Sequence, residues 1–272
     1  MGPARPVVKQ FLSAFKNRGR RATGRYTWPM AAQIEELLDR GFCVLRGHFP
    51  PLRIAACREA FWPVLTAYLE EHRHAPNRGP QRHFLPMPFD PPCYAPEFFF
   101  DPKILRIVRG VIGERIFADQ WGCDVPLPDS QYQEPHVDFA RPLFEEAPDL
   151  QLPPYMLLVS FGLAPVGAED GPIEIAAGTH RMPRPEALEA VRSGKIAMEA
   201  ATLEAGDVLI RHPWALHRGT PNRSCTPRAL ATIRYVRRWY WDASREVCGI
   251  GRATWQSMTP EQQALMRFPV EA

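Results

Sequence analysis

A histidine and an aspartate two residues apart, His136 and Asp138, have residue types and a spacing that suit metal binding. They lie in a strand-like stretch from Gln131 to Phe139. Side chains alternate faces along a strand, so both are expected to point to one side and to bind one ion from a single edge. A lone H-x-D pattern occurs by chance in many proteins and therefore indicates a metal site only weakly.

A second histidine, His217, completes this candidate site from a separate part of the chain. Gly206 and Asp207 form a predicted turn, residues 208–210 (VLI) a short buried strand, and His217 opens the next segment. Two histidines and one carboxylate on one face of an ion leave open positions for a chelating cosubstrate and O2. That is the ligand arrangement of non-haem Fe(II) oxygenases.

His212 competes with His217 for the same role. The two lie five residues apart, so on one continuous strand they would face opposite sides. His212 precedes Pro213 at the end of a strand, whereas His217 is followed eleven residues later by Arg228. We therefore favour His217 as the third ligand.

Arg228 enters the apolar stretch 229–233 (ALATI) after a polar turn. An arginine in a buried strand needs an anionic partner, because desolvating an unpaired charge is costly. Its planar guanidinium suits the distal carboxylate of a dicarboxylic acid, which it can bind through two N–H groups. The alternative is an ordinary ion pair with a nearby aspartate or glutamate.

Taken together, the motifs resemble the phytanoyl-CoA dioxygenase-like family. The resemblance rests on H-x-D at 136–138, GPIEIAAGTH at 171–180, GDVL at 206–209 and HRGTPNRSCTPR at 217–228. It runs from about residue 115 to 240, and more faintly from residue 34 (LLDRGFCVLRG). In combination these motifs are much more specific than any one of them.

The resemblance implies a double-stranded β-helix core that uses Fe(II), 2-oxoglutarate and O2 and yields succinate and CO2. By position, His136, Asp138 and His217 match the iron ligands, and Arg228 matches the arginine that binds the 2-oxoglutarate carboxylate. Halogenating relatives replace the ligand carboxylate with a small residue, so Asp138 favours hydroxylation or a related C–H oxidation.

Two polar residues are further candidates for contacting the cosubstrate. Many family members carry Ser or Thr two residues after the second histidine; here Gly219 stands there, with Thr220 next to it as a substitute. Gln133, and Gln131 on the same strand face, can also reach the site or can be solvated strand residues. Trp214 and the cluster 237–241 (RRWYW) can line a substrate entrance or simply pack.

The elements that must position these residues are mainly short strands. We expect helices at 30–40, at 51–72 with a break or kink at Pro63, after the cap Asp101, at 184–193 and from Thr259, with a long loop at 73–100 that acts as a lid. Strands are predicted at 42–45, 115–121, 131–139, 155–163, 172–176, 198–202, 207–212 and 229–240. The pattern predicts a mainly β fold with flanking helices (α+β), with a sandwich or barrel core at about 115–240 and a helical N-terminal third. The family resemblance implies that this core is a jelly roll.

Composition narrows the remaining choices. The 272 residues, 45% hydrophobic and 11% aromatic, suit one globular domain (1–272), with a loose basic stretch at 1–25. A net charge of +3 argues against nucleic acid as partner, and no apolar run approaches the length of a membrane span. The six cysteines show no C-x-x-C spacing, which favours reduced thiols in a cytoplasmic protein, monomeric or homodimeric, with a small-molecule substrate.

Two other functions use the same residues. One is a metal-dependent β-barrel hydrolase or isomerase, and the other is a non-catalytic metal-binding module. Arg228 argues against the first, because a hydrolase needs no anchor for a dicarboxylic acid. The intact ligand set argues against the second.

Overall fold

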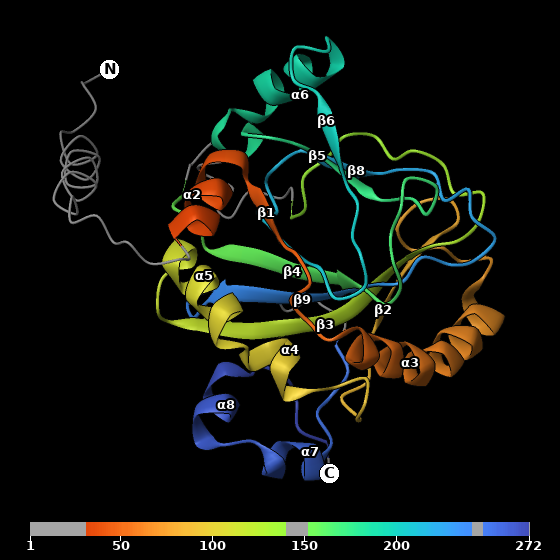
Figure 1. The fold of residues 1–272 in the computed structure, drawn as a ribbon, viewed down its shortest axis with the longest axis vertical. Helices are drawn as coiled ribbons and strands as arrows, with labels where there is room; N and C mark the ends of the chain where they lie inside the picture. Colours follow the sequence, from red (N-terminus) through yellow and green to blue (C-terminus); the bar gives the residue numbers. More distant parts are fainter. Residues whose placement is uncertain (1–30, 140–151, 241–246, 272) are drawn as a thin grey trace, which may run out of the picture. The chain divides into compact units, whose positions relative to one another are not determined.

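The structure is a computed structural model that describes residues 31–139, 152–240 and 247–271 (Figure 1). Its contacts divide the chain into residues 1–32, of which only Ala31 and Ala32 are described, and a compact unit of residues 33–272. The account below concerns this second unit. The basic stretch 1–25 lies outside the described residues. Across the described part of the chain, no helix has the length and apolar character needed to cross a membrane.

A large antiparallel sheet carries most of the fold. Its strand order is β1-β7-β4-β9-β3-β2. The bounds are β1 Phe42–Leu45, β2 Arg82–Pro86, β3 Ile116–Pro126, β4 Met156–Gly162, β7 Val208–Arg211 and β9 Leu230–Arg237. A smaller sheet has the order β6-β5-β8, with β5 Ile173–Ala176, β6 Met198–Ala201 and β8 His217–Gly219.

The two sheets bury a shared apolar core. Leu209 of β7 and Leu230 of β9 pack in one cluster with Ile173 and Ile175 of β5 and with Ala201 of β6. Neighbours within each sheet come from distant parts of the sequence, as β7 between β1 and β4 illustrates. Strands that alternate between two packed sheets in this way make a jelly-roll arrangement.

Alternation along the strands gives the large sheet two different faces. On one face, Phe161 of β4 and Trp121 of β3 pack against Phe98, with ring centroids 4.8 and 6.2 Å from that of Phe98. The hydroxyl of Tyr235 on β9 donates to the carbonyl of Phe99 at 2.8 Å. Figure 1 shows α4, which carries both phenylalanines, and the small sheet on opposite sides of the large sheet. The other face is therefore free to form the site.

Helices cover the outer face and the ends of the sheets. Their bounds are α2 Ala31–Arg40, α3 Pro51–His72, α4 Pro96–Phe100, α5 Pro102–Ile112, α6 Arg184–Arg192, α7 Arg252–Ser257 and α8 Pro260–Leu265, with a 3-10 turn at Thr179–Arg181. The Asp101 side chain caps α5 by accepting from the backbone of Lys103 and Ile104. Thr259 and Gln262 form a reciprocal capping box on α8. Both starts agree with the sequence analysis.

Three predicted elements differ from the structure. Residues 131–139 do not form a strand: only His136 makes a ladder-type bridge, to His217, and Pro135 has no N–H to offer a neighbour. The predicted loop 73–100 contains β2, which pairs with β3, and the short helix α4. α3 continues without a break through Pro63. The other predicted strands and the helix at 184–193 are confirmed to within a few residues.

Candidate metal centre

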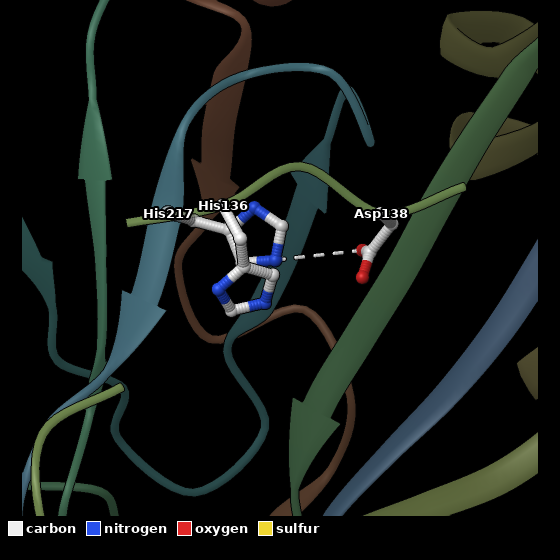
Figure 2. Close-up of side chains that lie close together, drawn as sticks. All are labelled: His136, Asp138 and His217. Atoms are coloured by element: carbon white, nitrogen blue, oxygen red, sulfur yellow. Dashed lines mark ion pairs between the residues drawn. The ribbon is translucent and has the colours of Figure 1, made fainter. Parts of the chain in front are cut away.

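His136, Asp138 and His217 converge, although two of them come from a segment that is not a strand (Figure 2). One ligand atom from each lies within 4.8 Å of the other two. The Nε2 atom of His217 is 3.5 Å from an Asp138 carboxylate oxygen, and the two imidazole centroids are 4.5 Å apart. Atoms this close can share one ion.

Backbone hydrogen bonds fix this convergence. His136 and His217 exchange N–H···O bonds in both directions, each of 2.9 Å. The N–H of Asp138 donates to the carbonyl of Pro213, also at 2.9 Å. β8 in turn pairs with β5, where His217 faces Ile175. The small sheet thus positions the site through β8, and residues 136–138 are held along that strand.

Both imidazoles offer the same nitrogen to an ion. Nδ1 of His136 lies 2.8 Å from the carbonyl of Glu134, and Nδ1 of His217 lies 2.9 Å from the carbonyl of Ala215. A carbonyl oxygen only accepts, so each Nδ1 must carry the proton and donate. The Nε2 lone pairs are then available for a metal, and the backbone contacts orient the rings as metal-ligating histidines require.

Electrostatics favour the protonation states that ligation needs. Burial alone would raise the pKa of Asp138, but the neighbouring Arg211 and His217 outweigh it and hold that pKa well below its usual range. Burial, followed by the proximity of His217, lowers the pKa of His136. An ionised carboxylate and a neutral imidazole are the forms that bind metal ions. The donor set therefore fits a divalent transition metal such as Fe(II).

His212 lies outside this cluster. Its ring packs between His180 and Trp214, with centroids 5.0 and 5.1 Å away, and its Nδ1 accepts from the backbone N–H of Trp214 at 3.3 Å. Burial, reinforced by His180 and Arg211, lowers the pKa of His212 to about 3. It is a neutral core histidine, and the geometry brings His217 rather than His212 to His136 and Asp138.

A cavity of about 600 Å³ adjoins the three side chains. Its floor is the inner face of the large sheet, where cross-strand pairs set residues in rows. One row joins Arg211 of β7, Leu158 of β4, Arg234 of β9 and Gln120 of β3. The next contains Ser160 and Thr232, whose hydroxyls lie 2.9 Å apart. All six residues line the cavity.

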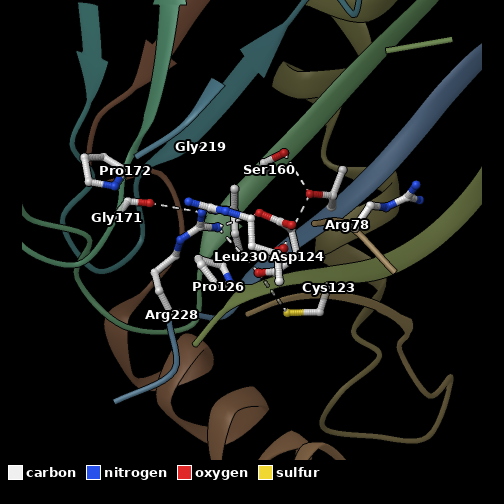
Figure 3. A network of polar contacts seen from close by, with 12 residues as sticks. Arg78, Cys123, Asp124, Pro126, Ser160, Gly171, Pro172, Gly219, Arg228 and Leu230 are labelled. Atoms are coloured by element: carbon white, nitrogen blue, oxygen red, sulfur yellow. Dashed lines mark hydrogen bonds and ion pairs between the residues drawn. The ribbon is translucent and has the colours of Figure 1, made fainter. Parts of the chain in front are cut away.

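Arg228 lies two residues before the start of β9 and is not among the described residues that line the cavity. It reaches the cavity wall through Asp124, which does line the cavity and whose carboxylate lies 3.1 Å from Nη1 of Arg228. Its Nη2 donates to the carbonyl of Gly171 at 3.0 Å (Figure 3). Only 4% of Arg228 is exposed. The arginine is buried as expected, with the local aspartate as its partner.

Gln133 and Thr220 are both held by the protein itself. Gln133 lines the cavity, but its amide oxygen accepts from the N–H of Gly219 and its amide nitrogen donates to the carbonyl of Arg78, each at 2.9 Å. The Thr220 hydroxyl donates to the carbonyl of Pro172 at 2.7 Å, and Thr220 is not among the described residues that line the cavity. Gln131, too, contacts only backbone, through its amide nitrogen and the carbonyl of Asp129.

Steric crowding explains why a glycine stands at position 219. A Cβ atom there would collide with Nη1 of the buried Arg82 and come within 2.8 Å of the Gln133 amide oxygen. Arg82 is fixed in turn by the backbone carbonyls of Gln131 and Thr220. The space that a Ser or Thr side chain would need is thus filled by two polar side chains.

The sequence analysis assigned no role to Arg211 and Arg234, which both line the cavity. Arg211 lies 2.8 Å from Asp138, and Arg234 pairs with the buried Asp119 at 2.8 Å. Each belongs to a short apolar stretch of the sequence, which is the feature that made Arg228 a candidate. Asn77, Arg78 and Phe84 from the predicted lid region also line the cavity, whereas no described residue of 247–271 does.

The aromatic residues proposed for the entrance pack elsewhere. Trp214 and Trp239 contact the ring of Tyr155, with centroids 4.6 and 4.9 Å away, and Tyr240 is buried beside them. None of these is among the cavity-lining residues. Trp241 lies outside the described residues.

Several solved structures are similar to this chain in fold. The non-heme alpha ketoglutarate dependent epimerase SnoN from nogalamycin biosynthesis is 17% identical with a TM-score of 0.56, covering 76% of this chain and 82% of its own. The carbocyclase SnoK from the same biosynthesis is 17% identical with a TM-score of 0.57, covering 76% and 83%. HygX from Streptomyces hygroscopicus, solved with nickel and 2-oxoglutarate bound, is 18% identical with a TM-score of 0.55, covering 77% and 88%.

At such low identity these structures establish the fold, which confirms the predicted jelly-roll core with its helical N-terminal part. The family assignment comes from the sequence. Residues 38–230, well over half of the chain, match the model of the phytanoyl-CoA dioxygenase family. The chain therefore belongs to the phytanoyl-CoA dioxygenase family of Fe(II)/2-oxoglutarate-dependent oxygenases.

Proposed function

We propose that this protein is a non-haem Fe(II)- and 2-oxoglutarate-dependent oxygenase that oxidises a C–H bond of a small-molecule metabolite. His136, Asp138 and His217 are the iron ligands. The observation that carries the proposal is the convergence of two imidazoles and one ionised carboxylate at the wall of a 600 Å³ cavity in a member of this family.

Each residue has a defined task in this function. When bound, iron and 2-oxoglutarate activate O2 for C–H oxidation, with succinate and CO2 as co-products. The two Nε2 atoms and the Asp138 carboxylate hold the metal, and the carbonyls of Glu134 and Ala215 keep both imidazoles in the ligating tautomer. The surrounding sheets limit access of bulk water to the reacting centre.

Arg228 is the proposed anchor for the distal carboxylate of 2-oxoglutarate. Its burial, its contact with the cavity-lining Asp124 and its guanidinium chemistry support this role. Its ion pair with Asp124 means that the cosubstrate must share or displace that carboxylate. Asp124 lines the cavity, so the exchange takes place where the ligand enters.

Hydroxylation is the proposed outcome of the oxidation. Asp138 occupies the coordination position that a halide would need, which argues against halogenation. Similar solved structures include an alpha ketoglutarate dependent epimerase and an alpha ketoglutarate dependent carbocyclase, so other proteins of this fold catalyse more than one kind of reaction. The two that come from nogalamycin biosynthesis support a specialised metabolite as substrate. A product 16 mass units heavier than the substrate identifies hydroxylation, and a product two units lighter identifies desaturation or ring closure.

The ligand assignment is tested by succinate formation with Fe(II), 2-oxoglutarate and ascorbate under air. Asp138→Ala and His136→Ala are expected to abolish iron-dependent succinate formation. Asp39→Ala, which removes an exposed carboxylate on α2, serves as the matched control and is expected to retain it. Wild-type turnover by Asp138→Ala at limiting iron would show that the assignment is wrong.

A further inference from the structure

One arginine that lines the cavity, Arg211, has N–H donors that no described residue satisfies. Arg211, the last residue of β7, is 8% exposed and lines the cavity. Its Nη2 lies 2.8 Å from the Asp138 carboxylate. Its Nε and Nη1 are buried and find no hydrogen-bond partner among the described residues. Leaving buried guanidinium N–H groups unpaired is costly, so such groups indicate an acceptor that arrives with a ligand.

Arg211 and Arg228 serve different ends of the cavity. Arg211 pairs across the sheet with Leu158, which in turn pairs with Arg234. Arg234 lies six residues beyond Arg228 along the chain, so Arg211 and Arg228 do not belong to the same cross-strand row. A cosubstrate whose distal carboxylate is anchored by Arg228 therefore leaves the unpaired donors of Arg211 for another molecule.

The charge balance of the cavity points to an anion. Among the described residues, the charged side chains that line it, together with their ion-pair partners, are Arg78, Arg211, Arg228 and Arg234 on the positive side and Asp119, Asp124 and Asp138 on the negative side. Fe(II) and 2-oxoglutarate add equal and opposite charges and leave this excess of one positive charge among the described residues unchanged. A partly buried positive charge favours a ligand of opposite sign.

We propose that Arg211 binds a carboxylate of the substrate beside the metal, so that the enzyme acts on an acidic small molecule. The inference rests on the proposed function and deepens it by naming the substrate class. A carboxylate supplies acceptor oxygens for the unpaired N–H groups and forms short, charge-assisted hydrogen bonds with a guanidinium. The contact between Arg211 and Asp138 places this anchor next to the reacting centre.

The test uses two probes that differ in charge and hardly in shape, 4-fluorobenzoate and 4-fluorobenzamide. Each is titrated into protein loaded with Zn(II) and 2-oxoglutarate, and binding is followed by ¹⁹F NMR. The acid is expected to bind the wild-type protein at least tenfold more tightly than the amide. Arg211→Met is expected to remove that preference. Arg252→Met, an exposed arginine on α7, is the matched control and is expected to keep it.

Each contrary result has a separate meaning. Equal binding of acid and amide to the wild-type protein, or no saturable binding of the acid, would overturn the proposal without the use of any variant. A preference that survives in Arg211→Met would do the same. If Arg211→Met lost 2-oxoglutarate binding as fully as Arg228→Met, Arg211 would serve the cosubstrate and not the substrate. Failure of the wild-type protein to bind Zn(II) or 2-oxoglutarate would instead contradict the proposed function itself.

Discussion

At the scale of single residues, charge pairs decide what the cavity can bind. Three of the four arginines in or beside it have an aspartate partner: Arg211 with Asp138, Arg228 with Asp124 and Arg234 with Asp119. Of these three pairs, only Arg234 and Asp119 have both side chains completely buried. The other two aspartates border the cavity, so a metal ion or a cosubstrate can compete for them.

The ion pair between Arg228 and Asp124 leads to a prediction about the binding of 2-oxoglutarate. Arg228→Met is expected to raise the 2-oxoglutarate concentration needed for half-maximal binding at least tenfold, about 1.4 kcal/mol, because the guanidinium is the anchor. Asp124→Asn removes the same ion pair but keeps the anchor, so it is expected to leave affinity unchanged or improve it. Calorimetric titration of the Zn(II)-loaded proteins measures both. Equal losses in the two variants would mean that Arg228 is only a structural partner of Asp124.

The residue-level chemistry was largely predictable from the sequence. H-x-D and the histidine of HRG supplied the converging side chains, and an arginine in an apolar run supplied the buried cation. Two things were not accessible in this way. Arg211 belongs to the same kind of apolar run, but its partner Asp138 is distant in sequence, so nothing local marked the contact. Nor does the sequence say that Asp124 meets Arg228 across β3 and β9.

At the scale of elements, β8 carries the site although it has only three residues. It pairs with β5 on one side, and on the other its residues bind Gln133 and His136 through backbone hydrogen bonds. The Gln133 amide adds a bond to the N–H of Gly219. This makes position 219 a point where the packing behind the metal centre is tight.

Gly219→Ser tests that packing. A side chain there must displace Arg82 or Gln133, and overpacking of a buried site typically costs about 1–3 kcal/mol. We expect a lower free energy of unfolding by that amount and weaker 2-oxoglutarate binding. Gly251→Ser is the matched control, because a Cβ atom there meets nothing within 4 Å and Gly251, like Gly219, does not have a positive φ. A fully stable Gly219→Ser protein with unchanged binding would contradict the steric account.

The strands were predicted best where the sequence contains a short continuous apolar run. β4, β7 and β9 are buried on both faces, read as short apolar runs, and were found at the expected places. The sequence of residues 131–139 resembles that of a strand. In the structure these residues form only one bridge, because their partner β8 is short and Pro135 lacks an N–H. The sequence did not predict β2, because it lies in a proline-rich stretch. Its pairing with β3 stabilises a strand there in spite of the low strand propensity of the local sequence.

At the scale of the whole molecule, the buried His212 makes the free energy of unfolding depend on pH. His212 has its pKa lowered to about 3 by burial and by His180 and Arg211, against about 6.5 in an unfolded chain. Between these values the unfolded chain binds the proton and the folded protein does not. The free energy of unfolding therefore falls as pH decreases through this window, by up to about 1.4 kcal/mol per pH unit from this one group.

His212→Asn keeps an acceptor for the backbone N–H of Trp214 and removes the titration. We expect this variant to lose less stability than the wild-type protein between pH 6.5 and pH 4.5, measured by urea unfolding. His74→Asn, at an exposed position, is expected to follow the wild-type curve. Parallel curves for wild type and His212→Asn would show that His212 is not held neutral by the fold.

The account as a whole depends on one metal ion being held by His136, Asp138 and His217 and completing the 2-oxoglutarate site. Equilibrium dialysis of 2-oxoglutarate against the wild-type protein under argon, with and without one equivalent of Fe(II), tests this most directly. The account predicts one molecule of 2-oxoglutarate bound per chain with iron and at least tenfold weaker binding without it. Binding that is equally strong without iron, or absent in its presence, would contradict it.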